Sequence, residues 1–166
     1  KKLLAPHGVP LVINDRIDIA LACCAEGVHL GQSDLPVDKA RKLLPPEVFI
    51  GLSVESMNDV FQSTRLPVDY LGVSPIFATP TKTDTKNAWG IDGLVEVRAF
   101  TQLPLVAIGG IHAGNAGEVL RAGADGLAIV SALCAADDPQ AAAETLRALC
   151  DEEMQAREQK NDQRSR

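Results

Sequence analysis

Short apolar segments alternate with amphipathic segments along most of this chain. Six segments are rich in Val, Ile and Leu with little polar alternation, which is typical of strands covered on both faces of a parallel sheet. They predict strands over residues 9–13, 27–30, 48–53, 70–74, 105–109 and 126–131. Helical periodicity between and after them predicts helices over residues 17–25, 36–44, 58–62, 94–100, 115–122 and 139–153. The chain therefore repeats a strand–helix unit.

Two connections in this repeat are alike. Ala25-Glu26-Gly27 and Ala124-Asp125-Gly126 each join a predicted helix to the next predicted strand. In both, we expect the glycine to release the helix in a left-handed conformation before the strand begins.

Strand–helix alternation predicts a parallel α/β fold, either an open doubly wound sheet or a barrel. No G-x-G-x-x-G motif opens a helix, which removes the main support for a dinucleotide-binding sheet. A TIM (β/α)8 barrel has about eight units, whereas this chain shows six after what reads as a leftover helix end. We therefore predict a TIM barrel with roughly the first two β/α units absent from this chain. Residues 1–152 would form this single domain, and residues 153–166 a polar tail that frays or is disordered.

Composition narrows the classes of function. Of 166 residues, 46% are hydrophobic, which is enough for a sizeable core. A net charge of −6 with no basic stripe argues against nucleic-acid binding. No apolar run reaches membrane-spanning length, and nothing resembles a signal peptide. The four cysteines lack C-x-x-C spacing, so we expect buried, reduced thiols in a cytoplasmic protein: Cys23, Cys24, Cys134 and Cys150.

Polar residues follow the predicted strands at their carboxyl ends, where ligands bind in α/β proteins. After the fourth strand come Thr79, Thr81 and Lys82, two hydroxyls and an ammonium that suit an anion. The alternative is an ordinary polar surface loop. The ligand interpretation gains weight because other strand ends carry complementary groups.

Two carboxylates, Asp15 and Asp34, follow the first and second predicted strands. They suit Mg²⁺, which takes one or two protein carboxylates and fills its other positions with water and substrate phosphate. The alternative for each is a helix N-cap, since both precede helical patterns. The capping alternative is strong for Asp34, which is followed closely by Pro36 at the start of a predicted helix. For Asp15 the metal and capping interpretations have about equal weight, because Asp18 could cap the helix instead. Together with the lysine loop, the pair favours a metal.

The pair Gly109-Gly110 follows the fifth predicted strand. Glycines let backbone N–H groups approach a phosphate and form an anion-binding concavity. If two units are missing, this strand is the seventh and Val130-Ser131 ends the eighth, and barrels often bind phosphate at those two loops. The alternative is a tight turn, which explains one glycine more easily than two.

Other polar residues near the strand ends admit simpler explanations. Ser53 either binds a substrate or caps the following helix, and we do not expect a nucleophile because the sequence places no partner base. We expect His29 to be a packed core residue and His112 a loop residue. Trp89 either covers the site or packs, and the sequence does not decide between them.

Six of these motifs carry a resemblance to a known family. They are Asn14-Asp15-Arg16, Gly27-Val28-His29-Leu30-Gly31-Gln32-x-Asp34, Gly51-x-Ser53, Thr79-x-Thr81-Lys82, Ala107-Ile108-Gly109-Gly110-Ile111 and Gly123-Ala124-Asp125-Gly126 through Val130-Ser131-Ala132. In this order and spacing, over about residues 9–132, the chain resembles the thiamine phosphate synthase (thiamine-phosphate pyrophosphorylase) family.

The resemblance implies a barrel transferase that joins hydroxymethylpyrimidine diphosphate to hydroxyethylthiazole phosphate, releasing thiamine phosphate and pyrophosphate with Mg²⁺. By motif, Asp15 and Asp34 would hold the metal. The residues implied to contact the pyrimidine diphosphate and serve catalysis are Asn14, Ser53 and Lys82. Those implied to hold the thiazole phosphate are Thr79, Thr81, Gly110, Val130 and Ser131. The family route passes through a pyrimidine-stabilised carbocation and needs no general base, which agrees with finding none.

The chain also departs from the family pattern. It lacks the family's Gln-x-Arg-x-Lys segment, has Ala78 where proline is common, and continues from the serine as Val54-Glu55-Ser56. Two alternatives therefore stay open: a thiazole tautomerase of the same fold, and a truncated phosphate-binding barrel without activity. The tautomerase would not need the paired aspartates or the lysine. The sequence is compatible with a homo-oligomer and does not decide whether another thiamine enzyme is fused to it.

Overall fold

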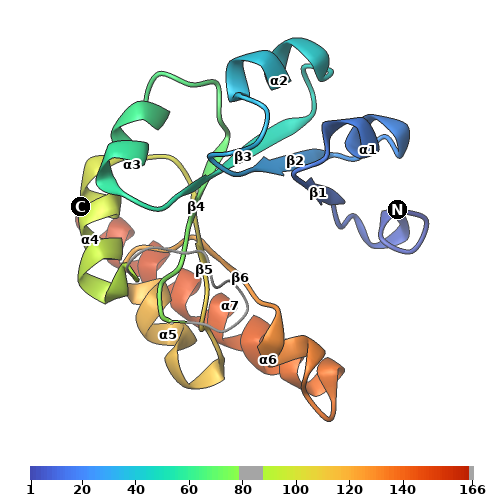
Figure 1. Cartoon of the computed structure of the whole chain (residues 1–166). Helices are drawn as coiled ribbons and strands as arrows, with labels where there is room; N and C mark the ends of the chain where they lie inside the picture. Colours follow the sequence, from blue (N-terminus) through green and yellow to red (C-terminus); the bar gives the residue numbers. More distant parts are fainter. Residues whose placement is uncertain (79–87, 165–166) are drawn as a thin grey trace. The chain divides into compact units, whose positions relative to one another are not determined.

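The structure is a computed structural model that describes residues 1–78 and 88–164, with side chains as far as residue 159 (Figure 1). The strands are β1 (Val12–Asn14), β2 (Gly27–Leu30), β3 (Phe49–Val54), β4 (Tyr70–Val73), β5 (Leu105–Ile108) and β6 (Gly126–Ala128). The helices are the 3-10 helix η1 (Ala5–His7), α1 (Ile17–Ala22), α2 (Val37–Leu43), α3 (Met57–Ser63), α4 (Gly90–Phe100), α5 (Ala113–Arg121), α6 (Ser131–Cys134) and α7 (Pro139–Arg164). The predicted alternation of strands and helices is confirmed.

Strands that follow one another in the chain are neighbours in the sheet, in the order β1-β2-β3-β4-β5-β6. The pairs β1·β2, β2·β3 and β5·β6 are parallel. The parallel α/β class predicted from the buried strand pattern is therefore confirmed. The chain divides into two compact units, Lys1–Gly72 and Val73–Arg166.

In the first unit, alternation of side chains along the strands separates an apolar face from a polar one. Val28, Leu30 and Ile50 on one face are fully buried, and helices α1, α2 and α3 contact these strands. Burial of each such side chain contributes about 1.5–3 kcal/mol. His29 pairs with Gly51 across β2 and β3, so both lie on the opposite face. The helices thus cover one face and leave polar side chains on the other.

Three acidic residues, Glu26, Asp69 and Asp125, stand immediately before β2, β4 and β6, and we call them the strand-start acids. The backbone N–H of each acid donates to the carbonyl of one residue in the preceding strand region. The carboxylate of the acid accepts from the backbone N–H of that residue. The N–H groups that the carboxylates bind belong to Leu11, Ile50 and Leu105, at 2.9, 2.7 and 2.8 Å. Each acid therefore fixes the register of two neighbouring strands at their amino ends.

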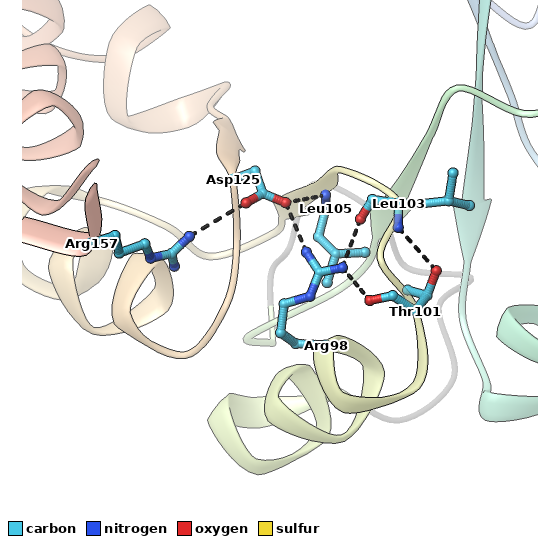
Figure 2. Close-up of polar contacts among 6 residues, drawn as sticks. All are labelled: Arg98, Thr101, Leu103, Leu105, Asp125 and Arg157. Carbon is cyan, nitrogen blue, oxygen red and sulfur yellow. Dashed lines mark hydrogen bonds and ion pairs between the residues drawn. The ribbon is translucent and has the colours of Figure 1, made fainter. Parts of the chain in front are cut away.

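Asp125 has further partners that hold the second unit together (Figure 2). One carboxylate oxygen accepts from Arg98 Nη1 at 2.9 Å and from the N–H of Leu105. Arg98 also donates to the carbonyls of Thr101 and Leu103. The other oxygen lies 3.4 Å from Arg157 Nη1 of α7. The acid thus connects β5, α4 and α7.

Helix α7 continues well past the predicted end at residue 153 and runs to Arg164. It lies beside α5 (Figure 1), and Glu153 forms an ion pair with Arg121. Arg157, within the segment expected to fray, contacts Asp125. These tertiary contacts explain why a polar segment is helical here. In the part of the chain that the structure describes, no helix has both the length and the apolarity to cross a membrane. The single domain over residues 1–152 stays a prediction.

The ends of other elements differ from the predictions by a few residues. β1 begins at Val12, and β6 ends at Ala128, so that Ser131 begins a short helix in place of ending a strand. The left-handed positions predicted at Gly27 and Gly126 are wrong, since neither has a positive φ.

Cys24 (φ 51°) and Gly123 (φ 125°) take the left-handed conformation after α1 and α5 in their place. The expectation that the four cysteines are buried is wrong, since two are exposed and two half-buried. Gly27 is required for a different reason. A Cβ added there would lie 2.2 Å from the Phe49 ring, so a side chain at this position and the aromatic ring cannot both fit.

Candidate functional site

Asp15 follows β1 with a positive φ of 65°, and its N–H donates to the His29 carbonyl at 2.8 Å. A left-handed conformation is uncommon for a residue with a side chain, although Asp tolerates it, and such outliers gather at functional sites. The capping alternative is excluded, because Arg16 occupies the N-cap of α1 and no side chain caps it. Asp18, the other cap considered, bonds Arg16 instead, and this holds the pKa of Asp18 at about 2.

Asp34 follows β2 and is half-buried. Its Oδ2 accepts from the N–H of Gly31 at 2.6 Å, which closes the turn between the strand and α2. Pro36 occupies the N-cap of α2 without a side-chain hydrogen bond, so the capping alternative is excluded here too. Asp15 and Asp34 therefore follow neighbouring parallel strands at the same edge, and neither serves the helix behind it.

Ser53 lies near the end of β3 and is 8% exposed. It does not cap the next helix, since Ser56 does so by accepting from the N–H of Asp59 at 3.2 Å. Its hydroxyl lies 2.8 Å from His29 Nε2, and its carbonyl accepts from Gln32 Nε2 at 2.6 Å. An imidazole that the sequence did not place therefore lies beside Ser53, and the expectation that this serine is not a nucleophile stays a prediction.

The expectation that His29 is a packed core residue is wrong. The side chain is half-buried, and both ring nitrogens have polar partners. Nδ1 lies 2.8 Å from the Tyr70 hydroxyl. Burial raises the pKa of Tyr70, so the phenol stays protonated over the working range of most enzymes. His29 pairs with Gly51 across β2 and β3, and Ser53, two residues further along β3, lies on the same face. The alternation of faces along each strand was the one sign of this contact that the sequence contained.

Gly51 makes room for Tyr70. A Cβ on Gly51 would lie 2.0 Å from Tyr70 Cζ, inside any allowed contact distance. The phenol therefore lies over the backbone of β3 and reaches His29 across it. Phe49 flanks the same ring at a centroid distance of 6.3 Å, in an edge-to-face arrangement.

In the second unit, Gly109 (φ 99°) and Gly110 (φ 66°) follow β5. Both conformations favour glycine, and both positions are also crowded. A Cβ on Gly109 would lie 2.9 Å from Pro75 Cβ, and one on Gly110 2.7 Å from Phe77 Cβ. The turn and the close packing together account for two consecutive glycines.

His112 is the N-cap of α5, the helix after the glycine pair. Its Nδ1 accepts from the N–H of Gly114 at 3.1 Å, and Asn115 Oδ1 accepts from the N–H of His112 at 2.8 Å. Asn115 Nδ2 donates in turn to the Gly110 carbonyl at 3.0 Å. His112 is therefore a loop and cap residue, as expected, and Asn115 fixes the glycine turn to α5.

Of the remaining residues considered for the site, three lie at the starts of helices and three lie outside the described residues. Val130 is 56% exposed at the N-cap of α6, and Ser131 is its exposed first residue. Trp89 is at the N-cap of α4, where its Cε3 would lie 3.0 Å from a Cβ on Gly93. Thr79, Thr81 and Lys82 lie outside the described residues.

Comparison with known proteins gives one consistent family. The family described as thiamine monophosphate synthase matches residues 1–133. A thiamine-phosphate synthase of Albidiferax ferrireducens is 74% identical over 151 residues, covering 91% of this chain and 69% of that relative. One from Vibrio campbellii is 53% identical over 149 residues, covering 90% of this chain and 73% of the relative.

The solved structures agree. The thiamine phosphate pyrophosphorylase from Pyrococcus furiosus superposes with a TM-score of 0.84 at 36% identity, covering 92% of this chain and 72% of that one. This likeness supports a TIM-like fold for the strands and helices described above.

Proposed function

Because this chain belongs to the thiamine monophosphate synthase family, whose relatives are thiamine-phosphate synthases and thus transferases, we propose how its residues serve that reaction. The substrates would be 4-amino-2-methyl-5-(diphosphomethyl)pyrimidine and 4-methyl-5-(2-phosphoethyl)thiazole. The products would be thiamine phosphate and pyrophosphate. The observation that carries the assignment of roles is the placement of Asp15 and Asp34 after neighbouring parallel strands, where neither caps a helix.

Asp15 and Asp34 would hold Mg²⁺. Their chemistry fits this ion, because it prefers carboxylate oxygens and needs only one or two from the protein when a substrate diphosphate supplies more. The left-handed backbone at Asp15 supports the proposal, since such a conformation is kept where the surrounding structure requires it. When bound, the ion would neutralise negative charge on the leaving pyrophosphate. Among the described residues no group of three or more His, Cys, Asp or Glu is placed to hold a metal.

Asn14, Ser53 and Lys82 would bind the pyrimidine diphosphate and serve catalysis. Asn14 ends β1 and pairs with His29 of β2, and Ser53 is two residues beyond Gly51, which pairs with His29 on its other side. A side-chain amide and a hydroxyl can donate to diphosphate oxygens or to ring nitrogens. Lys82 would supply positive charge to the leaving group.

Thr79, Thr81, Gly110, Val130 and Ser131 would hold the thiazole phosphate. The support among described residues is the positive φ at Gly110 together with the exposed start of α6 at Val130 and Ser131. Successive glycines leave backbone N–H groups open to a phosphate.

In this reaction the C–O bond to pyrophosphate breaks first, and its electron pair leaves with the pyrophosphate. The pyrimidine ring stabilises the carbocation that remains, and the thiazole nitrogen then supplies the pair for the new C–N bond. No proton is removed in either step, so no general base is required. The residues contribute by positioning the reactants and by stabilising charge.

Three coarser expectations also enter the proposal. A closed barrel has about eight β/α units, and we propose that the part of the relatives' length not spanned here supplies the two beyond the six of this chain. Residues 1–152 would belong to that one barrel domain. The protein would act in the cytoplasm, as a monomer or a homo-oligomer.

The test uses the chain extended to the length of its relatives, which we call the extended enzyme. Supplied with both precursors, it should release pyrophosphate only while Mg²⁺ is present, and EDTA should stop the release until excess Mg²⁺ restores it. No release with both precursors and Mg²⁺ would overturn the proposal. Isomerisation of a thiazole precursor that survives EDTA would indicate the tautomerase instead. Ligand binding without turnover would indicate the inactive phosphate-binding barrel.

Aspartate variants test the metal site in the same assay. Asp15→Asn and Asp34→Asn should each lower turnover by orders of magnitude at unchanged thermal stability. Asp18→Asn, on the neighbouring helix α1, is the matched control and should retain turnover. Full activity in Asp15→Asn would remove the metal role from that residue.

A further inference from the structure

Three polar side chains of the first unit form a continuous chain of hydrogen bonds across neighbouring strands. Tyr70 at the start of β4 bonds His29 of β2, and His29 bonds Ser53 of β3, each at 2.8 Å. Pairing of His29 with Gly51 places the ring on the same face as Ser53, two residues further along β3. The register of the strands thus brings together residues 24 and 41 positions apart.

The direction of the protons in this chain follows from counting donors and acceptors. A neutral imidazole donates from one ring nitrogen and accepts at the other. In one arrangement Tyr70 donates to Nδ1, and Nε2–H donates to Ser53 Oγ. In the other, Nδ1–H donates to Tyr70, and Ser53 donates to Nε2. Only the first leaves the Ser53 proton available to a ligand.

A ligand acceptor beside Ser53 favours the first arrangement, because Tyr70 then donates to Nδ1, Nε2–H donates to Ser53 Oγ, and Ser53 donates to the ligand. Within the part of the chain that the structure describes, His29 is the hydrogen-bond partner of the half-buried Tyr70 hydroxyl. In the second arrangement the phenol accepts from His29, and the ligand atom loses the Ser53 donor and with it one hydrogen bond. Burial also raises the pKa of Tyr70, which keeps that proton in place as a donor.

Two further contacts fix the serine. Gln32 Nε2 donates to the Ser53 carbonyl at 2.6 Å, so the backbone is held as well as the hydroxyl. Gly51 leaves the space in which the Tyr70 ring reaches His29, since any Cβ there would lie 2.0 Å from the ring. Ser53 is 8% exposed, so its hydroxyl has little room to turn toward solvent.

We propose that Tyr70 and His29 are positioning residues that orient the Ser53 hydroxyl. Tyr70 donates to His29 Nδ1, His29 Nε2 donates to Ser53 Oγ, and the Ser53 proton is directed at an acceptor atom of the pyrimidine diphosphate. This inference rests on the proposed function, because it takes Ser53 to contact that substrate. It adds two residues that touch no substrate and act through a third.

The tautomer of His29 tests the arrangement independently of activity. Nitrogen NMR of the extended enzyme with the pyrimidine diphosphate bound, and with the ring neutral, should show a protonated Nε2 and a bare Nδ1. The two kinds of nitrogen are distinguishable because their shifts differ widely. A protonated Nδ1 and a bare Nε2 in the unsubstituted complex would overturn the inference, whether or not the enzyme turns over.

Kinetics test the link to the substrate. Tyr70→Phe should raise the KM for the pyrimidine diphosphate by about 3- to 10-fold, the equivalent of one hydrogen bond, and leave the KM for the thiazole phosphate unchanged. His29→Gln, whose amide N–H can replace Nε2–H, should retain more activity than His29→Leu. Ser56→Ala, which removes only the cap of α3, is the control and should change neither KM.

A double-mutant cycle separates a positioning role from a merely structural one. If Tyr70 acts through Ser53, then Tyr70→Phe should have no further effect in a Ser53→Ala background. Additive effects would overturn the inference. An unchanged KM in Ser53→Ala would refute the substrate contact proposed for that serine, whereas the wrong tautomer would refute only the inference made here.

Discussion

Replacement of Asp125 by alanine should destabilise the fold through one buried N–H group more than through the two arginines it pairs with. Leu105 is fully buried, and its N–H donates to Asp125 at 2.8 Å, so Asp125→Ala leaves that donor without an acceptor at about 1–3 kcal/mol. The ion pairs with Arg98 and Arg157 are partly exposed, at side-chain exposures of 25% and 30% for the arginines, and contribute about 0–1 kcal/mol each. The expected loss is about 1–5 kcal/mol, or a fall in Tm of about 2–20 °C.

Thermal unfolding followed by circular dichroism measures this loss. Asp125→Asn retains an amide oxygen for the Leu105 N–H and removes only the charge, so it should cost about 1 kcal/mol or less. Asp137→Ala removes an exposed carboxylate of the same unit and should stay within about 0.5 kcal/mol of the unsubstituted protein. Equal losses in the alanine and asparagine variants would show that the charge, and not the buried N–H, dominates. A loss in Asp125→Ala no greater than in Asp137→Ala would refute the reasoning altogether.

Three further predictions concern other positions. Gly51→Ala should displace Tyr70 and lower stability by about 1–3 kcal/mol, and chemical denaturation measures this. Gly110→Ala combines a positive φ with a Cβ in van der Waals overlap, so it should destabilise the protein and, in the extended enzyme, weaken binding of the thiazole phosphate measured by calorimetry. Arg16 lowers the pKa of Asp18 to about 2, so this pair stabilises the fold above about pH 4 and the contribution is lost as pH falls toward 2. An NMR titration should therefore move the Asp18 midpoint upward in Arg16→Gln, and an unmoved midpoint would contradict the pairing.

The repeat of strands and helices could be predicted because β2, β3 and β4 are nearly continuous runs of buried residues, which leave a plain mark in the sequence. The strand Gly27–Leu30 has the predicted bounds, since its apolar residues stand between clear turn signals. The starts of the helices were harder to predict from the sequence. The residues at the N-caps of α1 and α2 are Arg16 and Pro36, and neither makes a side-chain capping hydrogen bond, although Asp15 and Asp34 stand one and two residues earlier. Asp34 instead accepts from the N–H of Gly31, on its strand side.

Contacts between distant segments could not be predicted from local pattern. The bond between His29 and Ser53 depends on the register of β2 and β3, which no local window contains. The helical state of the polar segment around Arg157 likewise depends on Asp125, 32 residues earlier. Asp15 and Asp34 were identified from the places where strands end, and their roles stay predictions.

The strand-start acids also divide the chain into pairs of strands. Glu26 fastens β2 to the segment before β1, Asp69 fastens β4 to β3, and Asp125 fastens β6 to β5. We call each of these carboxylate–N–H pairs a clasp. Among the described residues, no clasp joins β2 to β3 or β4 to β5. A circular permutant opened between α2 and β3 would therefore keep both halves of every clasp on one continuous stretch of chain, whereas new termini between β1 and β2 would separate Leu11 from Glu26.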